Sequence, residues 1–194
     1  MLGEAAQHAR QLLMIVAPVL HRAAGLVNQG HDAVDVRIVF QNAAVELLRD
    51  ARVGDLLTTI APATGLRTRR SQPYLEWRYG FAPLGYRAIA AGRDPAEGIA
   101  VFRVRRRGRA AEAALCELLV PDGATRAARH LARTVSRSTG ADYVVRLGRA
   151  APAAGFLPLP GQGPILTWRK LATTDTDAPA LGTWDLSLGD VELL

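Results

Sequence analysis

The stretch that decides the fold is GIAVFRVRRRGRAAEAALCELLVPDGATRAARHLARTVSRSTGADYVVRL, residues 98–147. Apolar residues alternate over 99–106 and again over 111–120, and the tight turn Arg107-Gly108-Arg109 joins the two runs. A period of two on both sides of a short glycine turn predicts a β-hairpin. The Pro-Asp-Gly sequence at 121–123 then ends the second strand, because proline and glycine interrupt regular pairing.

A helix and a further strand follow the hairpin. The segment 124–138 has an apolar stripe at helical spacing, and Gly140 is the kind of residue that ends a helix. The stripe consists of Ala127, Ala128, Leu131 and Val135. The run 143–147 is apolar enough for an internal strand. One β-α-β crossover inside an otherwise antiparallel series predicts an α+β fold, with a mixed, mostly antiparallel sheet and flanking helices.

The rest of the chain carries weaker patterns. An amphipathic helix is predicted over 4–27, with a kink at Pro18, and a strand over 34–40. The other predicted elements are short helices at 42–51 and 53–60, a polar loop at 62–73, a strand at 86–91, a turn at 92–98, a glycine- and proline-rich loop at 148–164, a strand at 165–171 and a last pairing segment at 184–186. We therefore expect an N-terminal helical segment, 1–33, and one domain, 34–194, with an acidic tail at 172–194.

Composition and charge narrow the classes of function. Hydrophobic residues make up 49% of the 194 residues and charged residues 22%, which is the composition of a folded domain. The net charge is +6, but five of the positive charges lie in one hairpin, at Arg103, 105–107 and Arg109. Such local basicity does not predict a general surface for polyanions, and nucleic acid is not expected as the main partner. A single cysteine, Cys116, allows no intrachain disulfide.

Hydropathy and residue usage bear on the location of the protein. No stretch reaches the roughly 18 apolar residues that a membrane-spanning helix needs. The best candidate, 12–20, is too short and contains Pro18. We therefore expect a soluble cytoplasmic protein without a membrane partner. The abundance of Arg, Ala, Gly and Pro is typical of a bacterium with a high-GC genome.

Among the motifs that could carry chemistry, the strand–turn–helix unit at 114–138 is the strongest. Common catalytic strings such as G-x-S-x-G and H-E-x-x-H are absent, and the four histidines do not cluster, so no metal is expected. A helix that begins after a glycine turn presents unpaired amides and a positive dipole end to an anion such as a pyrophosphate. Gly123 would allow close approach, and Arg126 would add a positive charge. The alternative is that Asp122-Gly123 serves turn geometry and helix capping alone.

Three further features have two interpretations each. The run 105–107 is either a phosphate contact or a solvated hairpin tip. Aromatic residues surround Arg78, and they form either a buried cation–π cluster or a surface that stacks on bases. These are Tyr74, Trp77, Tyr79, Phe81 and Tyr86. Cys116 is interpreted as a small buried hydrophobe rather than a nucleophile, on one strand face with Ala114, Leu118 and Val120.

Several short strings occur in an order that resembles a known superfamily. They are YLEWRY at 74–79 with Pro83 and Tyr86, the hairpin and helix at 98–138, the strand at 141–147, GFLP at 155–158 and WDLSLGD at 184–190. Over roughly 65–194 the chain resembles the GNAT-type N-acetyltransferases, and it is most similar to the C-terminal half of long bacterial two-part members. The resemblance implies an acyl-CoA N-acyltransferase fold.

The resemblance also implies a site and a reaction. The strands 111–120 and 141–147 would separate and admit the pantetheine arm of acetyl-CoA, and the loop 120–125 would hold the pyrophosphate. An amine, on a small molecule or a peptide, would attack the thioester directly while a base removes its proton. The implied donor contacts are Leu118, Leu119, Val120, Gly123, Ala124, Thr125 and Arg126. The candidates for acid and base are Glu117 and Tyr143, with Glu76 as a third.

The sequence departs from the family pattern at two places. The loop usually reads Q/R-x-x-G-x-G/A, and here only Gly123 matches, while Asp122 would repel a pyrophosphate unless it turns away to cap the helix. The helix that often supplies a tyrosine acid is replaced by the loop 148–164. The alternative function is therefore a catalytically silent module that packs on a partner acyltransferase domain or forms a homodimer. Nucleic-acid binding through the arginine hairpin is a third, weaker hypothesis.

Overall fold

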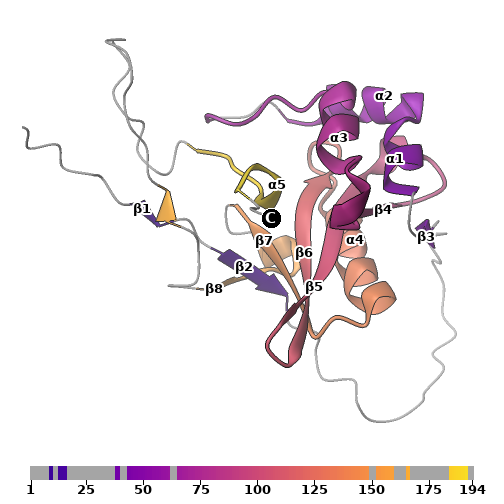
Figure 1. Ribbon diagram of the computed structural model, residues 1–194. Helices are drawn as coiled ribbons and strands as arrows, with labels where there is room; N and C mark the ends of the chain where they lie inside the picture. Colours follow the sequence, from indigo (N-terminus) through magenta and orange to yellow (C-terminus); the bar gives the residue numbers. More distant parts are fainter. Residues whose placement is uncertain are drawn as a thin grey trace, which may run out of the picture.

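The computed structural model describes residues 43–61, 65–148, 152–159 and 184–191, together with the backbone of four short strands at 9–10, 13–16, 38–39 and 165–166. Seven strands form one sheet in the order β3-β4-β5-β6-β7-β2-β8, and β1 pairs separately with β9 (Figure 1). The strands are β1 (Ala9–Arg10), β2 (Leu13–Val16), β3 (Ile38–Val39), β4 (Arg87–Ala90), β5 (Ile99–Arg107), β6 (Ala110–Leu119), β7 (Tyr143–Leu147), β8 (Leu157–Leu159) and β9 (Ile165–Leu166).

The sheet is mixed and mostly antiparallel, so the predicted fold class is confirmed at this level. Every neighbouring pair in the sheet is antiparallel except β6 and β7, which run parallel. The crossover between those two strands is α4 (Thr125–Thr139), as the sequence predicts. Gly140, with φ of 61°, ends this helix in the left-handed conformation that glycine adopts without strain.

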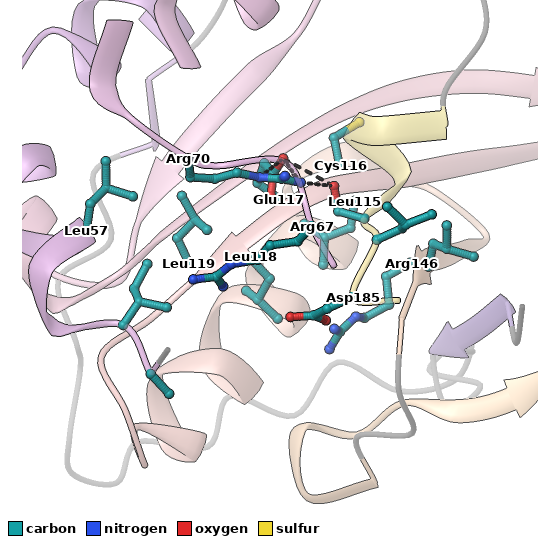
Figure 2. Close-up of a pocket in the computed structure, with 15 residues that line it drawn as sticks. Leu57, Arg67, Arg70, Leu115, Cys116, Glu117, Leu118, Leu119, Arg146 and Asp185 are labelled. Carbon is teal, nitrogen blue, oxygen red and sulfur yellow. Dashed lines mark hydrogen bonds and ion pairs between the residues drawn. The ribbon is translucent and has the colours of Figure 1, made fainter. Parts of the chain in front are cut away.

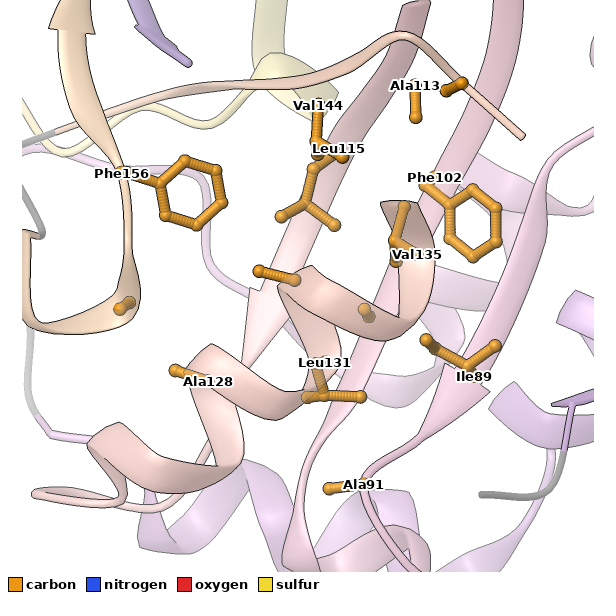
Figure 3. Packing of buried hydrophobic residues seen from close by; sticks show 14 residues of the cluster. Ile89, Ala91, Phe102, Ala113, Leu115, Ala128, Leu131, Val135, Val144 and Phe156 are labelled. Carbon is orange, nitrogen blue, oxygen red and sulfur yellow. The ribbon is translucent and has the colours of Figure 1, made fainter. Parts of the chain in front are cut away.

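Helices cover both faces of the sheet. On one face α4 packs Leu131 and Val135 against Phe102 and Leu115 of the central strands (Figure 3). The opposite face carries α1 (Ala43–Leu48), α2 (Ala51–Thr59) and α3 (Gln72–Tyr79), whose buried residues pack on β4, β5 and β6. The short α5 (Leu188–Val191) lies beside β6 and β7, where Leu188 packs against Val145. Because alternate residues of the central strands are apolar toward each helical layer, these strands are buried on both faces.

Local signals explain where the helices on the second face begin. Asp50 accepts a hydrogen bond from the Arg52 amide at 3.0 Å and caps α2. Ser71 accepts one from the Tyr74 amide at 3.3 Å and caps α3. Short polar side chains at these positions satisfy amides that have no partner inside the helix. The predicted short helices at 42–51 and 53–60 are confirmed.

Several predictions from the sequence need correction. The helix predicted over 4–27, and with it the helical character of the N-terminal segment, is wrong at 13–16, where β2 pairs with both β7 and β8. A short apolar run fits a strand as well as a helix, and here the pairing partners decide. The predicted loop at 148–164 contains the short helix η3 (Pro152–Ala154) and the strand β8. The remaining parts of the strands predicted at 34–40 and 165–171 lie outside the described residues.

At the C-terminal end the predicted pairing segment is reduced to one residue. Trp184 forms a single parallel bridge with Leu66, and α5 follows. The strand at 86–91 is confirmed as β4, and the turn at 92–98 contains the short helix η2 (Pro95–Glu97). No helix in the described ranges has the length and hydropathy of a membrane-spanning segment.

Candidate functional site

The parallel strands β6 and β7 separate along their length. They pair through only three positions, from Glu112 opposite Tyr143 to Ala114 opposite Val145. Beyond these pairs β6 continues to Leu119 while still bonded to β5, and β7 continues beside β2. The β7-facing edge of β6 beyond Ala114 therefore has no strand partner in the described structure. An edge without a strand partner is where another extended chain can pair.

A cavity of about 340 Å³ fills this opening. It is bounded by the separated ends of β6 and β7, the C-terminal end of α2, the segment around Arg70 and the segment before α5 (Figure 2). The lining residues are Leu57, Ile60, Ala61, Arg67, Arg70, Leu115, Cys116, Glu117, Leu118, Leu119, Arg146, Leu147, Asp185, Leu186 and Ser187. The cavity thus combines aliphatic walls with three arginines and two acids.

A bulge in β6 brings Glu117 to the cavity. Val101 pairs with Glu117 and Phe102 with Leu115, so Cys116 is an extra residue between them. Strict alternation after Leu115, which packs toward α4, would direct Glu117 toward the same apolar cluster. Instead Glu117 reaches Tyr79 on the opposite face. Bulges reorient side chains in this way, and they occur often beside active sites.

Glu117 is buried, with 4% of its surface exposed, and three residues bind the same oxygen of its carboxyl group. The Tyr79 hydroxyl donates to Oε1 at 2.7 Å, Arg70 Nε at 3.1 Å and the Ser187 hydroxyl at 3.2 Å. Within the described residues Oε2 accepts no hydrogen bond, although Glu117 lines the cavity. Burial raises the pKa of Glu117 and outweighs Arg70 and Tyr79, which lower it.

Arg70 joins this carboxylate to α5. Its Nη2 lies 2.9 Å from Glu117 Oε1 and donates to Asp190 Oδ2 and to the Ser187 hydroxyl, both at 2.7 Å. Burial raises the pKa of Asp190, but hydrogen bonds from Arg70, the Ser187 amide and Thr68 outweigh it, so the pKa lies below its usual value. Burial lowers the pKa of Arg70, and the two carboxylates raise it further than burial lowers it. The network therefore ties β6, α3 and α5 together beside the cavity.

The predicted donor-contact residues are only partly brought together. Leu118 and Leu119 line the cavity, whereas Val120, Gly123, Ala124, Thr125 and Arg126 lie beyond it in the turn and the start of α4. The Asp122 amide donates to the Thr59 carbonyl at 3.0 Å, and the Ala124 and Thr125 amides donate to carbonyls within the turn. Asp122 is not the helix cap, because Ala124 occupies that position without a side-chain hydrogen bond.

The acid and base candidates lie in three different places. Only Glu117 lines the cavity. Tyr143 lies at the paired end of β7, where its hydroxyl donates to Glu112 Oε2 at 3.1 Å, and Glu76 accepts from Arg49 at 3.3 Å on the surface of α3. The sequence did not indicate Arg70, Ser187 or Arg146, because they come from segments that are distant in sequence and meet only in the folded chain.

The aromatic and cysteine predictions are partly confirmed. Tyr79 and Tyr86 are buried edge to face at 4.9 Å, with Arg78 within 5.8 Å of each ring, as a cation–π core predicts. Trp77 and Phe81 are 75% and 55% exposed instead. Cys116 is buried as predicted. The bulge, however, places Leu118 and Val120 on the opposite face, against the α4 cluster.

The arginine hairpin is partly neutralised by an acid of its own. Glu112 is buried on β6, and it forms salt bridges with Arg105 at 2.5 Å and with Arg107 at 3.6 Å.

Among the described residues, no three His, Cys, Asp or Glu side chains gather as a group that could hold a metal. Comparisons with protein-family models, with curated proteins and with solved structures find no match for this chain.

Proposed function

We propose that this domain is a GNAT-type N-acyltransferase that binds acetyl-CoA or another acyl-CoA between β6 and β7 and transfers the acyl group to an amine. The observation that carries the proposal is the parallel pair that separates after Ala114 and Val145, with a cavity in the opening. A pantetheine arm is a narrow chain with two amide groups. It could bind along the edge of β6 that has no strand partner beyond Ala114, as an added strand does, through backbone hydrogen bonds.

In this proposal Glu117 is the general base. The amine nitrogen attacks the thioester carbonyl carbon, a C–N bond forms, the C–S bond breaks and the thiolate leaves. Glu117 Oε2 takes the proton that the amine loses, directly or through one water, and the proton then returns to the thiolate. A raised pKa suits this role, because a base is most effective when its pKa approaches the working pH. Tyr79 and Arg70 would hold the carboxylate through Oε1.

The phosphates of the donor would lie at the start of α4. The first turn of a helix leaves amides without intrahelical partners, and the helix dipole favours an anion there. Arg126 is exposed in this first turn and would add charge. Because the Ala124 and Thr125 amides already bond within the turn, we assign the anion to the amides of the first helical turn rather than to those of the turn itself.

The experiment is a calorimetric titration of the protein with acetyl-CoA. An Ile60→Trp variant places a large side chain in the cavity lining at the end of α2, and Thr58→Trp is the matched control, since Thr58 is exposed on the same helix outside the lining. We expect Ile60→Trp to weaken binding at least about tenfold and Thr58→Trp to leave it unchanged. Equal binding by both variants would place the ligand elsewhere.

The engaged turn amides favour a second candidate, the catalytically silent GNAT-like module. Such a module would use the same fold to pack on a catalytic domain or on a second copy. It predicts neither heat nor a thermal shift with acetyl-CoA at millimolar concentration. Saturable heat in that titration would exclude it.

A further inference from the structure

The cavity contains two partly buried arginines whose surroundings differ. Arg70 is surrounded by acceptors: the carboxylates of Glu117 and Asp190, the Ser187 hydroxyl and the Thr68 carbonyl at 2.7 Å. Arg146 extends into the cavity from β7 (Figure 2). Within the described part of the chain it donates no hydrogen bond and forms no salt bridge, and its guanidinium carbon lies 5.4 Å from the centre of the Phe156 ring, a cation–π contact.

An arginine in this position is costly for the folded protein. Burial lowers the pKa of Arg146, although Asp185 and Glu117 act in the opposite direction. A guanidinium that loses water without gaining a bonded anion has a desolvation cost that the Phe156 ring and more distant carboxylates offset only in part. Asp185 lines the same cavity, yet no salt bridge joins it to Arg146 among the described residues. A charged side chain that lines a cavity without an ion-pair partner is typical of a ligand-binding site.

Two neighbouring residues define the surroundings of the Arg146 guanidinium. Gly148 leaves room for the guanidinium, because a Cβ there would lie 3.0 Å from Arg146 Nη2. Arg67 is exposed at the cavity, and in the described structure it likewise has no hydrogen bond or salt bridge. Arg67 and Arg146 thus both line the cavity, and neither forms a salt bridge within the described residues, although Asp185 lies between them (Figure 2).

We infer that the cavity recognises a substrate carboxylate, with Arg146 as its anchor and Arg67 as a second contact at the mouth. A guanidinium binds a carboxylate through two parallel hydrogen bonds. A phosphate dianion fits less well, because Glu117 and Asp185 border the same space and would repel its second charge. The aliphatic walls near the anchor, Leu115 and Leu147, suit the short carbon chain that carries a carboxylate.

This inference names the substrate class of the proposed transferase, and in that sense rests on it. The carboxylate has two possible sources: an acceptor that carries both an amine and a carboxylate, as an amino acid does, or a dicarboxylic acyl group on the donor. The experiment is therefore a calorimetric titration with four probes: L-glutamate, succinate, succinyl-CoA and acetyl-CoA.

Three variants accompany the wild type. Arg146→Met removes the anchor, Arg146→Lys keeps the charge without the paired donors, and Arg133→Met is a control, since Arg133 is exposed on α4 and outside the cavity. We expect Arg146→Met to weaken carboxylate binding about 10- to 100-fold, Arg146→Lys to have an intermediate effect and Arg133→Met to have none. Because Arg146 has no hydrogen bond or salt bridge within the described residues, and methionine can keep the contact with the Phe156 ring, Arg146→Met should unfold at the same urea concentration as the wild type or a higher one.

The outcomes separate this inference from the proposed function. Binding of glutamate with no preference for succinyl-CoA assigns the carboxylate to the acceptor, and preference for succinyl-CoA over acetyl-CoA assigns it to the donor. Suppose that acetyl-CoA binds but the carboxylate probes do not, or that they bind Arg146→Met as tightly as the wild type. Either result overturns the inference and leaves the transferase proposal standing. Binding of succinate or glutamate that depends on Arg146, with no binding of either CoA ester, supports the inference and overturns the transferase proposal. No binding by any probe overturns both.

Discussion

Replacing Arg70 by methionine should lower the free energy of unfolding strongly, because this one side chain forms ion pairs with two carboxylates. Arg70 is the cation beside two buried carboxylates, and the side chains of Glu117 and Asp190 are only 4% and 5% exposed. Methionine fills a similar volume but removes the cation from both acids, which keep only neutral hydrogen-bond donors. Breaking a buried ion pair from one side costs about 3–5 kcal/mol, because the remaining charge is left in a medium that solvates it poorly.

Urea unfolding measures this loss as a change in the free energy of unfolding. The control is Arg49→Met, which removes the exposed partner of Glu76, where the side-chain exposures are 68% and 32%. Exposed pairs contribute about 0–1 kcal/mol, so this control should change little. A double variant that adds Glu117→Gln should regain part of the loss, since it removes one of the unpaired charges.

The loss should also depend on pH. In the wild type, hydrogen bonds to the Asp190 carboxylate hold its pKa below the usual value, so this contribution to stability is lost as the pH falls. In Arg70→Met, both buried acids lack a cation, their folded-state pKa values rise, and stability is lost as the pH increases. The deficit should therefore be larger at pH 8 than at pH 5. A loss under about 1 kcal/mol at pH 7, or a deficit that does not change with pH, would refute this account of the network.

Three further predictions concern the turns and α5. Asp50→Ala should lower the free energy of unfolding by about 0.5–2 kcal/mol at pH 7. Because hydrogen bonds from Arg52 lower the pKa of Asp50 to about 2 from its usual 3.8, this loss of stability should persist at pH 4 and shrink toward pH 2. A loss that stays constant down to pH 2 in urea unfolding would contradict the capping role. Gly123→Glu should abolish acetyl-CoA binding in calorimetry. Gly108→Glu is the control for backbone strain, because Gly108 has a similar positive φ in the hairpin turn, and it should leave binding unchanged. Retained affinity in Gly123→Glu would show that the turn does not approach the phosphates. Gly189→Ala should displace α5, because a Cβ would meet the Tyr79 hydroxyl and Glu117 Oε1. Alkylation of the single cysteine, the buried Cys116, by iodoacetamide should then accelerate about tenfold or more, and an unchanged rate would mean that α5 does not limit access to Cys116.

The hairpin and crossover were predictable because their signals are local. Alternation over the two strands, a glycine turn and a helix with one apolar stripe each leave a pattern within about fifteen residues. The place of the strand 143–147 beside the second hairpin strand, with which it pairs in parallel at 143–145, followed from the β-α-β order. The strand at 13–16 was not predictable in this way, since its partners lie at least 128 residues away (Val16 pairs with Val144) and its own composition fits either a helix or a strand.

The candidate site was only partly predictable for a related reason. Glu117 was selected, but strict alternation could not show that the bulge at Cys116 turns it toward Tyr79. A bulge depends on the register with the neighbouring strand, and sequence alternation alone does not fix that register. Arg70 and Arg146 could not be predicted, because the sequence does not distinguish an arginine that has an acidic partner in the folded protein from one that has none.

The most direct test of the β6–β7 site is a methyl NMR titration of the leucine- and isoleucine-labelled protein with acetyl-CoA. Leu118, Leu119 and Leu147 line the opening, whereas Leu131 is buried under α4, away from it, and serves as the internal reference. The proposal predicts saturable shifts of the three cavity leucines, together with Ile60, while Leu131 stays unchanged. Shifts confined to other methyl groups, or none at millimolar acetyl-CoA, would contradict the assignment of this opening as an acyl-CoA site.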